Sequence, residues 1–153
     1  MKYAIGIDPG KESGAGIATT EGDVYCLPIG WALGGNLDAV DAFARELGLT
    51  GPPSMVGIEL QHVGRNPMTS LRTARTSGEI AQACAVQWPD AVIIWLSPPE
   101  WRSMIGIPNR KPAALEWAAA NVQGEIPRSE DAREAAGIAR ATVQTLMANR
   151  QVE

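Results

Sequence analysis

Residues 2–8, KYAIGID, alternate in polarity as a β-strand does, and the Pro-Gly pair that follows predicts a turn at the end of the strand. Residues 55–60, MVGIEL, predict a second strand of the same design. In each, a glycine and an acid two residues apart share one face, and the acid is Asp8 or Glu59. Helical crossovers should make the two strands parallel. If they are also neighbours, the two carboxylates lie side by side where α/β sheets usually bind ligands. We expect the glycine beneath each acid to leave room above the sheet.

The other expected elements extend these strands into one layered sheet. Two strands, at 14–20 and 23–29, are joined by a Glu-Gly turn and predict an antiparallel meander with the first strand. Residues 91–96, AVIIWL, are continuously apolar, which is typical of a strand buried on both faces. The expected helices span 37–47 after the cap Asn36, about 67–87 opened by Asn66, a short stretch from Pro112, and about 130–150 after the cap Ser129. With a basic, proline-rich loop after residue 96, the order βββαβαβαα indicates an α/β domain with a mixed sheet.

Length and composition indicate a soluble globular protein. The chain of 153 residues is 45% hydrophobic and 20% charged, which suggests one domain over residues 1–153. No apolar run approaches the ~20 residues of a membrane span, and the early acid Asp8 argues against a signal peptide. Cys26 and Cys84 lack metal-ligand spacing, so we expect buried thiols and a cytoplasmic location. The one histidine, His62, excludes sites that need two histidines.

The net charge of −4 argues mildly against a nucleic-acid partner, but the basic side chains are unevenly distributed. Two stretches of the second half contain basic residues and no acid: one holds Arg65, Arg72 and Arg75, and the other holds Arg102, Arg110 and Lys111. Such patches can contact phosphates while the whole chain stays acidic. On charge alone, ordinary solvated surfaces are the preferred interpretation.

The last expected helix carries two further acids on one face. Asp131 and Glu134 are three residues apart, and Ile138, with Ala135 and Thr142, marks the inward face of this helix. Both acids should therefore point towards the sheet. Together with Asp8 and Glu59 they form a set of oxygen ligands, which suits magnesium or manganese and not zinc.

Some of the acids also have a simpler interpretation. Asp8 can serve only the turn, by bonding its backbone, and acids at Glu130 and Asp131 are favoured by the dipole of the first helical turn. Neither interpretation covers Glu134, which lies past the first turn, or Glu59, because acids are depleted in strands and costly when unpaired. The four acids together favour a metal site over coincidence.

The motifs resemble those of a known family. They are GIDPG at 6–10 with a second glycine at 14, IE at 58–59, and EDAREAAGIA at 130–139. In these motifs, and over nearly the whole chain, the sequence resembles RuvC-type Holliday junction resolvases of the ribonuclease H-like superfamily. The resemblance implies a mixed five-stranded sheet, with strands 1–3 antiparallel and strands 1, 4 and 5 parallel, flanked by helices. The sequence departs from the family pattern at Glu134, where Asp is usual, and in the spacing of the loop 106–111. The short chain suggests a compact, phage-type member, and the resemblance implies the cytoplasm of a bacterial or phage-infected cell.

The resemblance also implies a mechanism. Two magnesium ions ~4 Å apart, or manganese ions in their place, would direct a water at the phosphodiester and neutralise the developing charge. Asp8 would bridge the ions, Glu59 would hold one, and Asp131 with Glu134 would hold the other. Lys111 or Arg110 would donate to the scissile phosphate. The cut would leave a 5′-phosphate and a 3′-hydroxyl, and paired symmetric cuts would resolve a four-way DNA junction.

The same resemblance implies a homodimer, whose two-fold axis matches that of a four-way junction. The helix from residue 67 carries a small-residue stripe. Its members Gly78, Ala81 and Ala85 could form the dimer contact, although packing of these three on the helix's own sheet is the preferred interpretation. The members of this stripe are Leu71, Ala74, Gly78, Ala81 and Ala85. Arg65, Arg72 and Arg75 could contact phosphates of the junction arms. No membrane partner is expected, and a structural role is preferred for His62.

Three alternatives stay open. An actin-like ATPase or sugar kinase shares the acid and glycine-rich turn after the first strand, but these proteins need two such domains. Another ribonuclease H-like enzyme, such as a ribonuclease H or a transposase core, would share the metal chemistry and differ in substrate. A non-catalytic junction-binding protein is the third, and the presence of all four acids argues against it.

Overall fold

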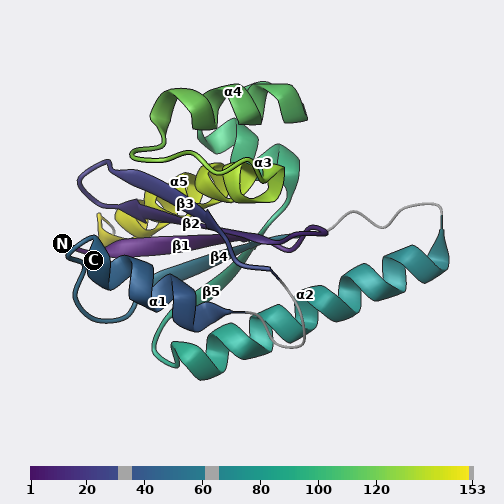
Figure 1. Cartoon of the computed structure of the whole chain (residues 1–153), viewed down its shortest axis with the longest axis horizontal. Helices are drawn as coiled ribbons and strands as arrows, with labels where there is room; N and C mark the ends of the chain where they lie inside the picture. The colour runs from purple at the N-terminus through teal and green to yellow at the C-terminus, as the bar shows by residue number, and fades with distance from the viewer. Residues whose placement is uncertain (31–35, 61–65, 152–153) are drawn as a thin grey trace.

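The computed structural model describes residues 1–30, 36–60 and 66–151, so His62 and Arg65 lie outside the described residues. Its centre is a five-stranded sheet in the order β3-β2-β1-β4-β5 (Figure 1). The strands are β1 (Tyr3–Asp8), β2 (Gly14–Thr19), β3 (Val24–Pro28), β4 (Met55–Glu59) and β5 (Val92–Leu96). Strands β1, β2 and β3 are antiparallel, and β1, β4 and β5 are parallel. The mixed sheet expected from the sequence is therefore confirmed.

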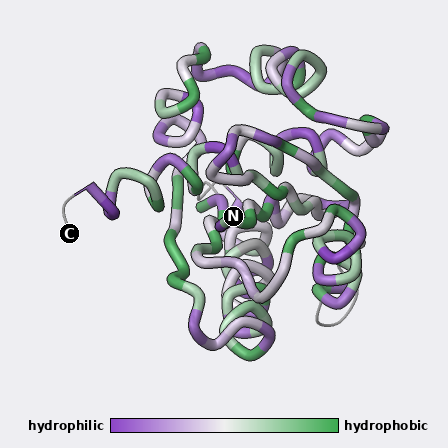
Figure 2. The backbone as a smooth tube through the Cα atoms, turned by 90° about the vertical axis from the view of Figure 1, so that its left-hand side faces the viewer, coloured by the Kyte–Doolittle hydropathy of each residue, from purple (hydrophilic) through white to green (hydrophobic). Residues whose placement is uncertain are grey.

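Helices cover both faces of the sheet (Figure 1). On one face lie α1 (Leu37–Glu46) and α2 (Pro67–Gln87), and on the other lies α5 (Glu130–Arg150), with α3 (Pro98–Met104) and α4 (Lys111–Asn121) packed against it. Hydropathy alternates along the helices, as expected when each turns one side to the core (Figure 2). Among the described residues, no helix combines the length and the apolar character that a membrane crossing needs.

The two faces of the sheet are packed with side chains of different size. Towards α1 and α2, the strands present large aliphatic residues, including Ile5 and Ile58, which meet Val40 and Ile80. Towards α5, they present small residues such as Ala4 and Ala18, which meet a row of alanines on the helix, Ala132, Ala136 and Ala139. The alternation of side chains along each strand separates these two cores.

A row of glycines brings α5 against the sheet. Gly6 of β1 is in register with Gly16 of β2 and Gly57 of β4, so the three lie side by side across neighbouring strands. A Cβ atom on Gly6 would overlap the backbone of α5 at Ala135 and Ala139, and one on Gly57 would overlap the hydroxyl of Thr142. The room expected above these glycines is therefore not open, because α5 fills it.

The loop expected after residue 96 contains a helix, α3. Ser97 caps this helix: its hydroxyl accepts the N–H of Glu100, and the Glu100 carboxylate accepts the N–H of Ser97 in return. Proline is tolerated in the first turn of a helix, where its missing N–H would have no intrahelical partner. The proline-rich composition predicted a loop, but the stretch forms a helix that begins with a capping box. The element order is therefore βββαβαβααα.

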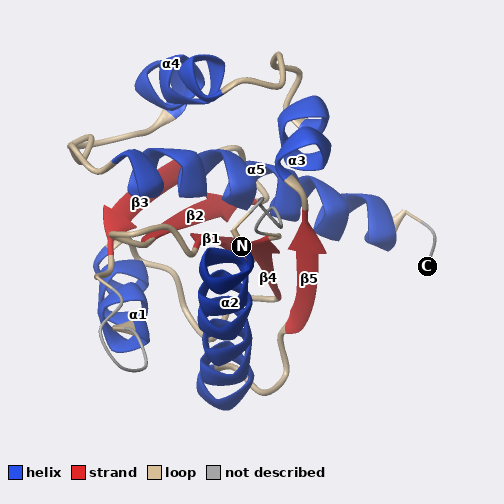
Figure 3. Ribbon diagram, turned by 90° about the vertical axis from the view of Figure 1, so that its right-hand side faces the viewer, coloured by secondary structure: helices blue, strands red, loops and turns tan. Residues whose placement is uncertain are grey.

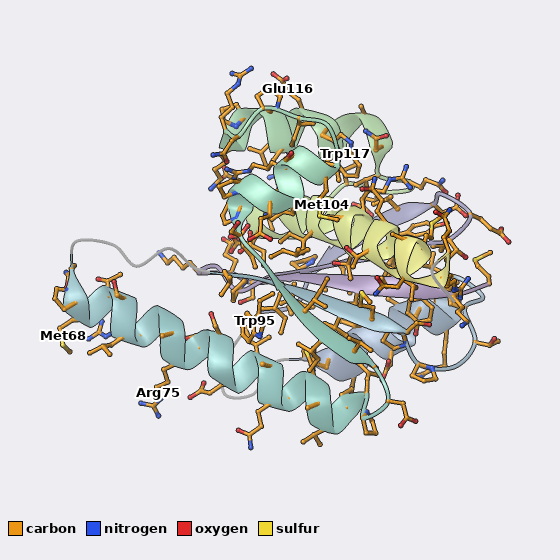
Figure 4. The ribbon with its side chains drawn as sticks, turned by 180° about the vertical axis from the view of Figure 1, so that it is seen from behind. Met68, Arg75, Trp95, Met104, Glu116 and Trp117 are labelled. Atoms are coloured by element: carbon orange, nitrogen blue, oxygen red, sulfur yellow. The ribbon has the colours of Figure 1, made fainter. Side chains whose placement is uncertain are left out.

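Strand β5 is not buried on both faces, as its apolar sequence predicted. It is the last strand of the sheet, and Val92 is 54% exposed and Trp95 39% exposed. Figure 4 shows Trp95 on the side of the sheet that faces α2. A strand with a continuous apolar sequence is buried on both faces only where neighbouring elements cover both faces. Here the neighbouring elements cover β5 incompletely.

The small-residue stripe of α2 does not pack on the sheet, so the preferred interpretation of this stripe is wrong. The helix instead buries Ser77, Ile80 and Cys84, and of the stripe only Ala81 is partly buried in the core. The amino-terminal half of α2 projects beyond the sheet (Figures 1 and 4). Both cysteines are buried and unpaired, as expected.

Candidate active site

Three of the predicted carboxylates meet at the end of β1. Asp8 ends that strand, and Asp131 and Glu134 lie in the first turns of α5. Each offers one oxygen, and these oxygens lie within 4.8 Å of one another. Asp8 and Glu134 are buried, and Asp131 is partly buried. The prediction that both helix acids point towards the sheet is confirmed, as is the inward position of Ile138.

Local structure fixes Asp131 tightly against the β1–β2 turn. Its Oδ2 accepts the backbone N–H groups of Glu12 at 2.9 Å and Ser13 at 3.1 Å. A Cβ on Gly10 would overlap the Asp131 carboxylate, so glycine at this position allows the close approach. Asp131 therefore organises the turn in addition to facing the site, a role that its place in the first helical turn did not predict.

Asp8 also serves its turn, as the simpler interpretation proposed. Its Oδ1 accepts the backbone N–H of Gly10 at 3.0 Å. This bond orients the carboxylate and uses only part of its acceptor capacity, because an ionised carboxylate has about four lone-pair sites. The turn role and a ligand role are therefore compatible.

Glu59 lies beside this cluster, outside the spacing that groups the other three. It ends β4, next to β1 in the sheet, and is buried. Its Oε2 accepts the indole N–H of Trp101 at 2.8 Å. The parallel, adjacent strands expected from the Gly-x-acid pattern are confirmed, and they place Glu59 close enough to raise the pKa of Asp8.

Burial and mutual repulsion make the ionised cluster costly. Burial raises the pKa of Asp8 well above its usual value, and the charges of Glu59, Glu134 and Asp131 raise it further. Burial likewise raises the pKa of Glu59 to about 7, against the lowering effect of the Trp101 hydrogen bond. A divalent cation would relieve this repulsion, and carboxylate oxygens are the ligands that magnesium and manganese prefer. The donor set therefore fits such an ion.

Two basic side chains border the cluster. Arg102 of α3 places Nη2 at 2.9 Å from Oε1 of Glu134, and its side chain is only 12% exposed. Lys111, the first residue of α4, places Nζ at 2.7 Å from Oε2 of Glu130 and at 4.0 Å from Oε2 of Glu134. The structure thus brings Lys111 to the site, whereas Arg110, the cap of α4, is exposed without a side-chain capping bond.

Sequence reasoning missed two residues of this site, Trp101 and Arg102. Arg102 was noticed only as part of a basic stretch, because the residues around it were expected to form a loop. The signal that could have placed both was the capping box from Ser97 to Glu100, since a helix beginning there brings residues 101 and 102 onto its first turns.

The other basic residues proposed to contact DNA lie away from the acids. Arg72 and Arg75 are exposed on the projecting part of α2, on the opposite side of the sheet from α4 (Figures 1 and 4). Arg75 pairs with Glu79 of the same helix, with Nε and Oε1 3.1 Å apart. The described basic residues that were proposed to contact DNA are therefore divided between two places, and Arg65 lies outside the described residues.

Comparisons with known proteins show which of them share this architecture. No protein-family model matches the chain, and no curated protein matches it in sequence. Among solved structures, RuvC of Thermus thermophilus in complex with a Holliday junction substrate superposes with a TM-score of 0.67 and 16% identity, over 97% of this chain and 96% of that one. A second Thermus thermophilus RuvC structure gives a TM-score of 0.67 and 16% identity, over 96% of each chain. The fold of the chain is that of the RuvC-type Holliday junction resolvases.

Proposed function

We propose that the chain is a metal-dependent endonuclease that resolves four-way DNA junctions by paired symmetric nicks. The observation that carries the proposal is the convergence of Asp8, Asp131 and Glu134 at the carboxyl end of β1. This convergence occurs in a fold shared with a RuvC whose structure contains a Holliday junction substrate. The proposal treats residues 1–153 as one nuclease domain.

In this proposal Asp8, Asp131 and Glu134 hold magnesium, for which manganese can substitute, and Glu59 supplies a further carboxylate beside them. When bound, such ions activate a water for attack on the phosphodiester and neutralise the charge that develops on the leaving oxygen. The protein contributes a buried set of oxygens that is already assembled, so few side chains need to be ordered when an ion arrives. The products carry a 5′-phosphate and a 3′-hydroxyl.

Lys111 is the residue best placed to meet the scissile phosphate. Its hydrogen bond to Glu130 raises its pKa, so the ammonium stays charged at neutral pH. Its side chain is 49% exposed, and an exposed ion pair of this kind contributes little to stability. Exchange of Glu130 for a phosphate oxygen therefore costs little, and the ammonium would stabilise negative charge on the phosphate.

The arms of the substrate are assigned to the basic residues outside the cluster. Arg72 and Arg75, together with Arg65, would contact phosphates from the α2 side, and Arg110 would do so from the α4 side. A homodimer would present two such sites to the two symmetric strands of a junction. In this proposal, these contacts bind the arms of the four-way junction.

The test uses a labelled four-way junction, and in parallel linear duplex, single strand and an RNA–DNA hybrid, each with magnesium and with chelator. Asp8→Asn and Glu134→Gln are compared with the wild type, and Asp90→Asn and Glu46→Gln serve as matched controls at exposed positions. The expected result is paired nicks in the junction that need magnesium, disappear in the two site variants and persist in the controls.

Other outcomes would change the function. Cleavage of the hybrid in place of the junction would keep the acidic site and assign the protein to another ribonuclease H-like activity. Binding of the junction without cleavage in magnesium or manganese would leave a non-catalytic junction-binding protein. Cleavage that survives both site substitutions would remove Asp8 and Glu134 from the mechanism.

A further inference from the structure

We propose that Trp101 and Arg102 are positioning residues that hold the two glutamates of the acidic site in a metal-ready arrangement. The inference rests on the proposed function, because it concerns the same site. Helix α3 lies beside α5 at the carboxyl ends of β4 and β5 (Figure 3). From there, adjacent residues of one short helix contact Glu59 of the sheet and Glu134 of α5.

The two contacts are alike in form. The Trp101 indole N–H donates to Oε2 of Glu59 at 2.8 Å, and Arg102 Nη2 donates to Oε1 of Glu134 at 2.9 Å. Each donor engages one oxygen of a carboxylate. A carboxylate held in this way loses rotational freedom before any ion binds, and such supporting hydrogen bonds are a common feature of metal sites.

The donors are themselves held firmly. Trp101 is fully buried, and its ring lies so close to Gly137 of α5 that a Cβ there would overlap it. The Arg102 guanidinium lies over the Trp101 ring, with Cζ 5.1 Å from the ring centroid, and Nη1 donates to Oδ1 of Asn109 at 3.1 Å. The ring, Asn109 and Glu134 therefore confine the guanidinium, so it can orient Glu134 accurately.

A purely stabilising role does not account for Arg102. Its Nε is buried and has no hydrogen-bond partner among residues 1–30, 36–60 and 66–151. A buried donor without a partner costs free energy, and a buried ion pair is often no more stable than an apolar replacement of the same volume. A guanidinium kept at this position despite the cost is better explained by the geometry that it imposes on Glu134.

The length of Glu134 gives the arginine a specific task. Glutamate has one more rotatable bond than aspartate, so its carboxylate loses more rotamer entropy when it is fixed. Arg102 fixes it through Oε1, while Oε2 lies 4.0 Å from Nζ of Lys111. A shorter acid at position 134 would not reach Arg102 in the same way, so the two residues should act as a unit.

The opposite idea is that Arg102 competes with the metal. A guanidinium on Glu134 repels a cation electrostatically, so its removal would then tighten metal binding. The two ideas predict changes of opposite sign in metal affinity.

The experiment measures Mn²⁺ affinity by titration calorimetry on the full chain without DNA, for Arg102→Met, Arg102→Lys and Trp101→Phe. Arg45→Met and Trp95→Phe are matched controls outside the site. We expect Arg102→Met and Trp101→Phe to weaken Mn²⁺ binding about 10- to 100-fold, the range typical of lost supporting bonds. Arg102→Lys keeps the charge but loses the planar fork, and should recover only part of the affinity. Thermal unfolding in chelator checks that each variant folds, and Arg102→Lys carries the test if Arg102→Met does not.

A double-mutant cycle with Glu134→Asp tests whether Arg102 and Glu134 act as a unit. In the Glu134→Asp background, the Arg102 substitution should cause a smaller fold-change in Mn²⁺ affinity than in the wild type.

Unchanged or tighter Mn²⁺ binding in the Arg102 and Trp101 variants would overturn the inference. Mn²⁺ binding by a wild-type protein that cuts no junction would instead remove the proposed function and leave the inference standing, and absence of Mn²⁺ binding by the wild type would overturn both.

Discussion

The helices on the two faces of the sheet meet it in different ways. Helix α5 packs its backbone on Gly6 and Gly16 and the Thr142 side chain on Gly57. Helix α2, over its described residues, instead packs through side chains such as Ile80 in its carboxyl-terminal half. Close backbone contact leaves little freedom to slide or rotate, and packing at one end leaves the other end of the helix in solvent. The rigid contact carries the acids, and the projecting end of α2 carries exposed Arg72 and Arg75. Positions that need accurate geometry thus lie on the closely packed side.

The largest effect should come from adding one methyl group to the closely packed side. Gly6→Ala would place a Cβ into the backbone of α5 at Ala135 and Ala139, which cannot yield as a flexible side chain can. We expect the free energy of unfolding to fall by about 3 kcal/mol or more, as measured by urea denaturation. A loss under about 1 kcal/mol would show that α5 can lift from the sheet, and the contrast between the two faces would not hold.

The next effect concerns pH, and it follows from the acids that α5 and the sheet bury together. Burial raises the pKa of Glu59 from 4.5 to about 7, and the pKa of Asp8 is also raised. The pKa values of these two acids are higher in the folded protein than in the unfolded chain. Their protonated forms therefore stabilise the fold at low pH, and this stabilisation is lost as the pH rises through the folded pKa values. In chelator, the free energy of unfolding should fall by on the order of 2–3 kcal/mol between pH 5 and pH 8.

Magnesium provides the control for that prediction. With magnesium in excess, the fall in stability towards pH 8 should become smaller, because an ion that binds only the folded state stabilises it most when the carboxylates are ionised. Denaturation curves at matched ionic strength would separate this effect from general screening. A stability that rises from pH 5 to pH 8 in chelator would contradict the electrostatic account of the site.

The smallest effect should come from the same methyl group on the other helix. Gly78 of α2 has nothing within 4 Å of a Cβ atom placed on it, and glycine in an exposed helix interior costs about 0.5–1 kcal/mol relative to alanine. Gly78→Ala should therefore stabilise the protein by about that amount in the same urea experiment. A destabilisation would mean that this part of α2 is covered in solution, and sedimentation of the variant would show whether a second copy covers it.

The strand ends and the inward face of α5 could be predicted from sequence because both depend on local periodicity. Asp8 and Glu59 follow from alternation along a strand, and Asp131 and Glu134 follow from their spacing on a helix. Parallel neighbouring strands and the helix Glu130–Arg150 then place Asp8, Asp131 and Glu134 together. Each of these inferences needed only the residues of one element and a general rule of α/β architecture.

Only the tertiary structure decided which neighbours each element meets. The glycines of β1 and β4 do not line an open space, because α5 fills the volume that their missing side chains leave, with its backbone at Gly6 and with the Thr142 side chain at Gly57. Apart from Ala81, the stripe of α2 faces solvent, and β5 is partly exposed, since burial depends on what lies over an element as much as on its own composition. Trp101 and Arg102 reach the acids because α3 follows β5 directly and packs on α5. Periodicity acts over a few residues, whereas these contacts join residues far apart in the chain, so packing alone selects them.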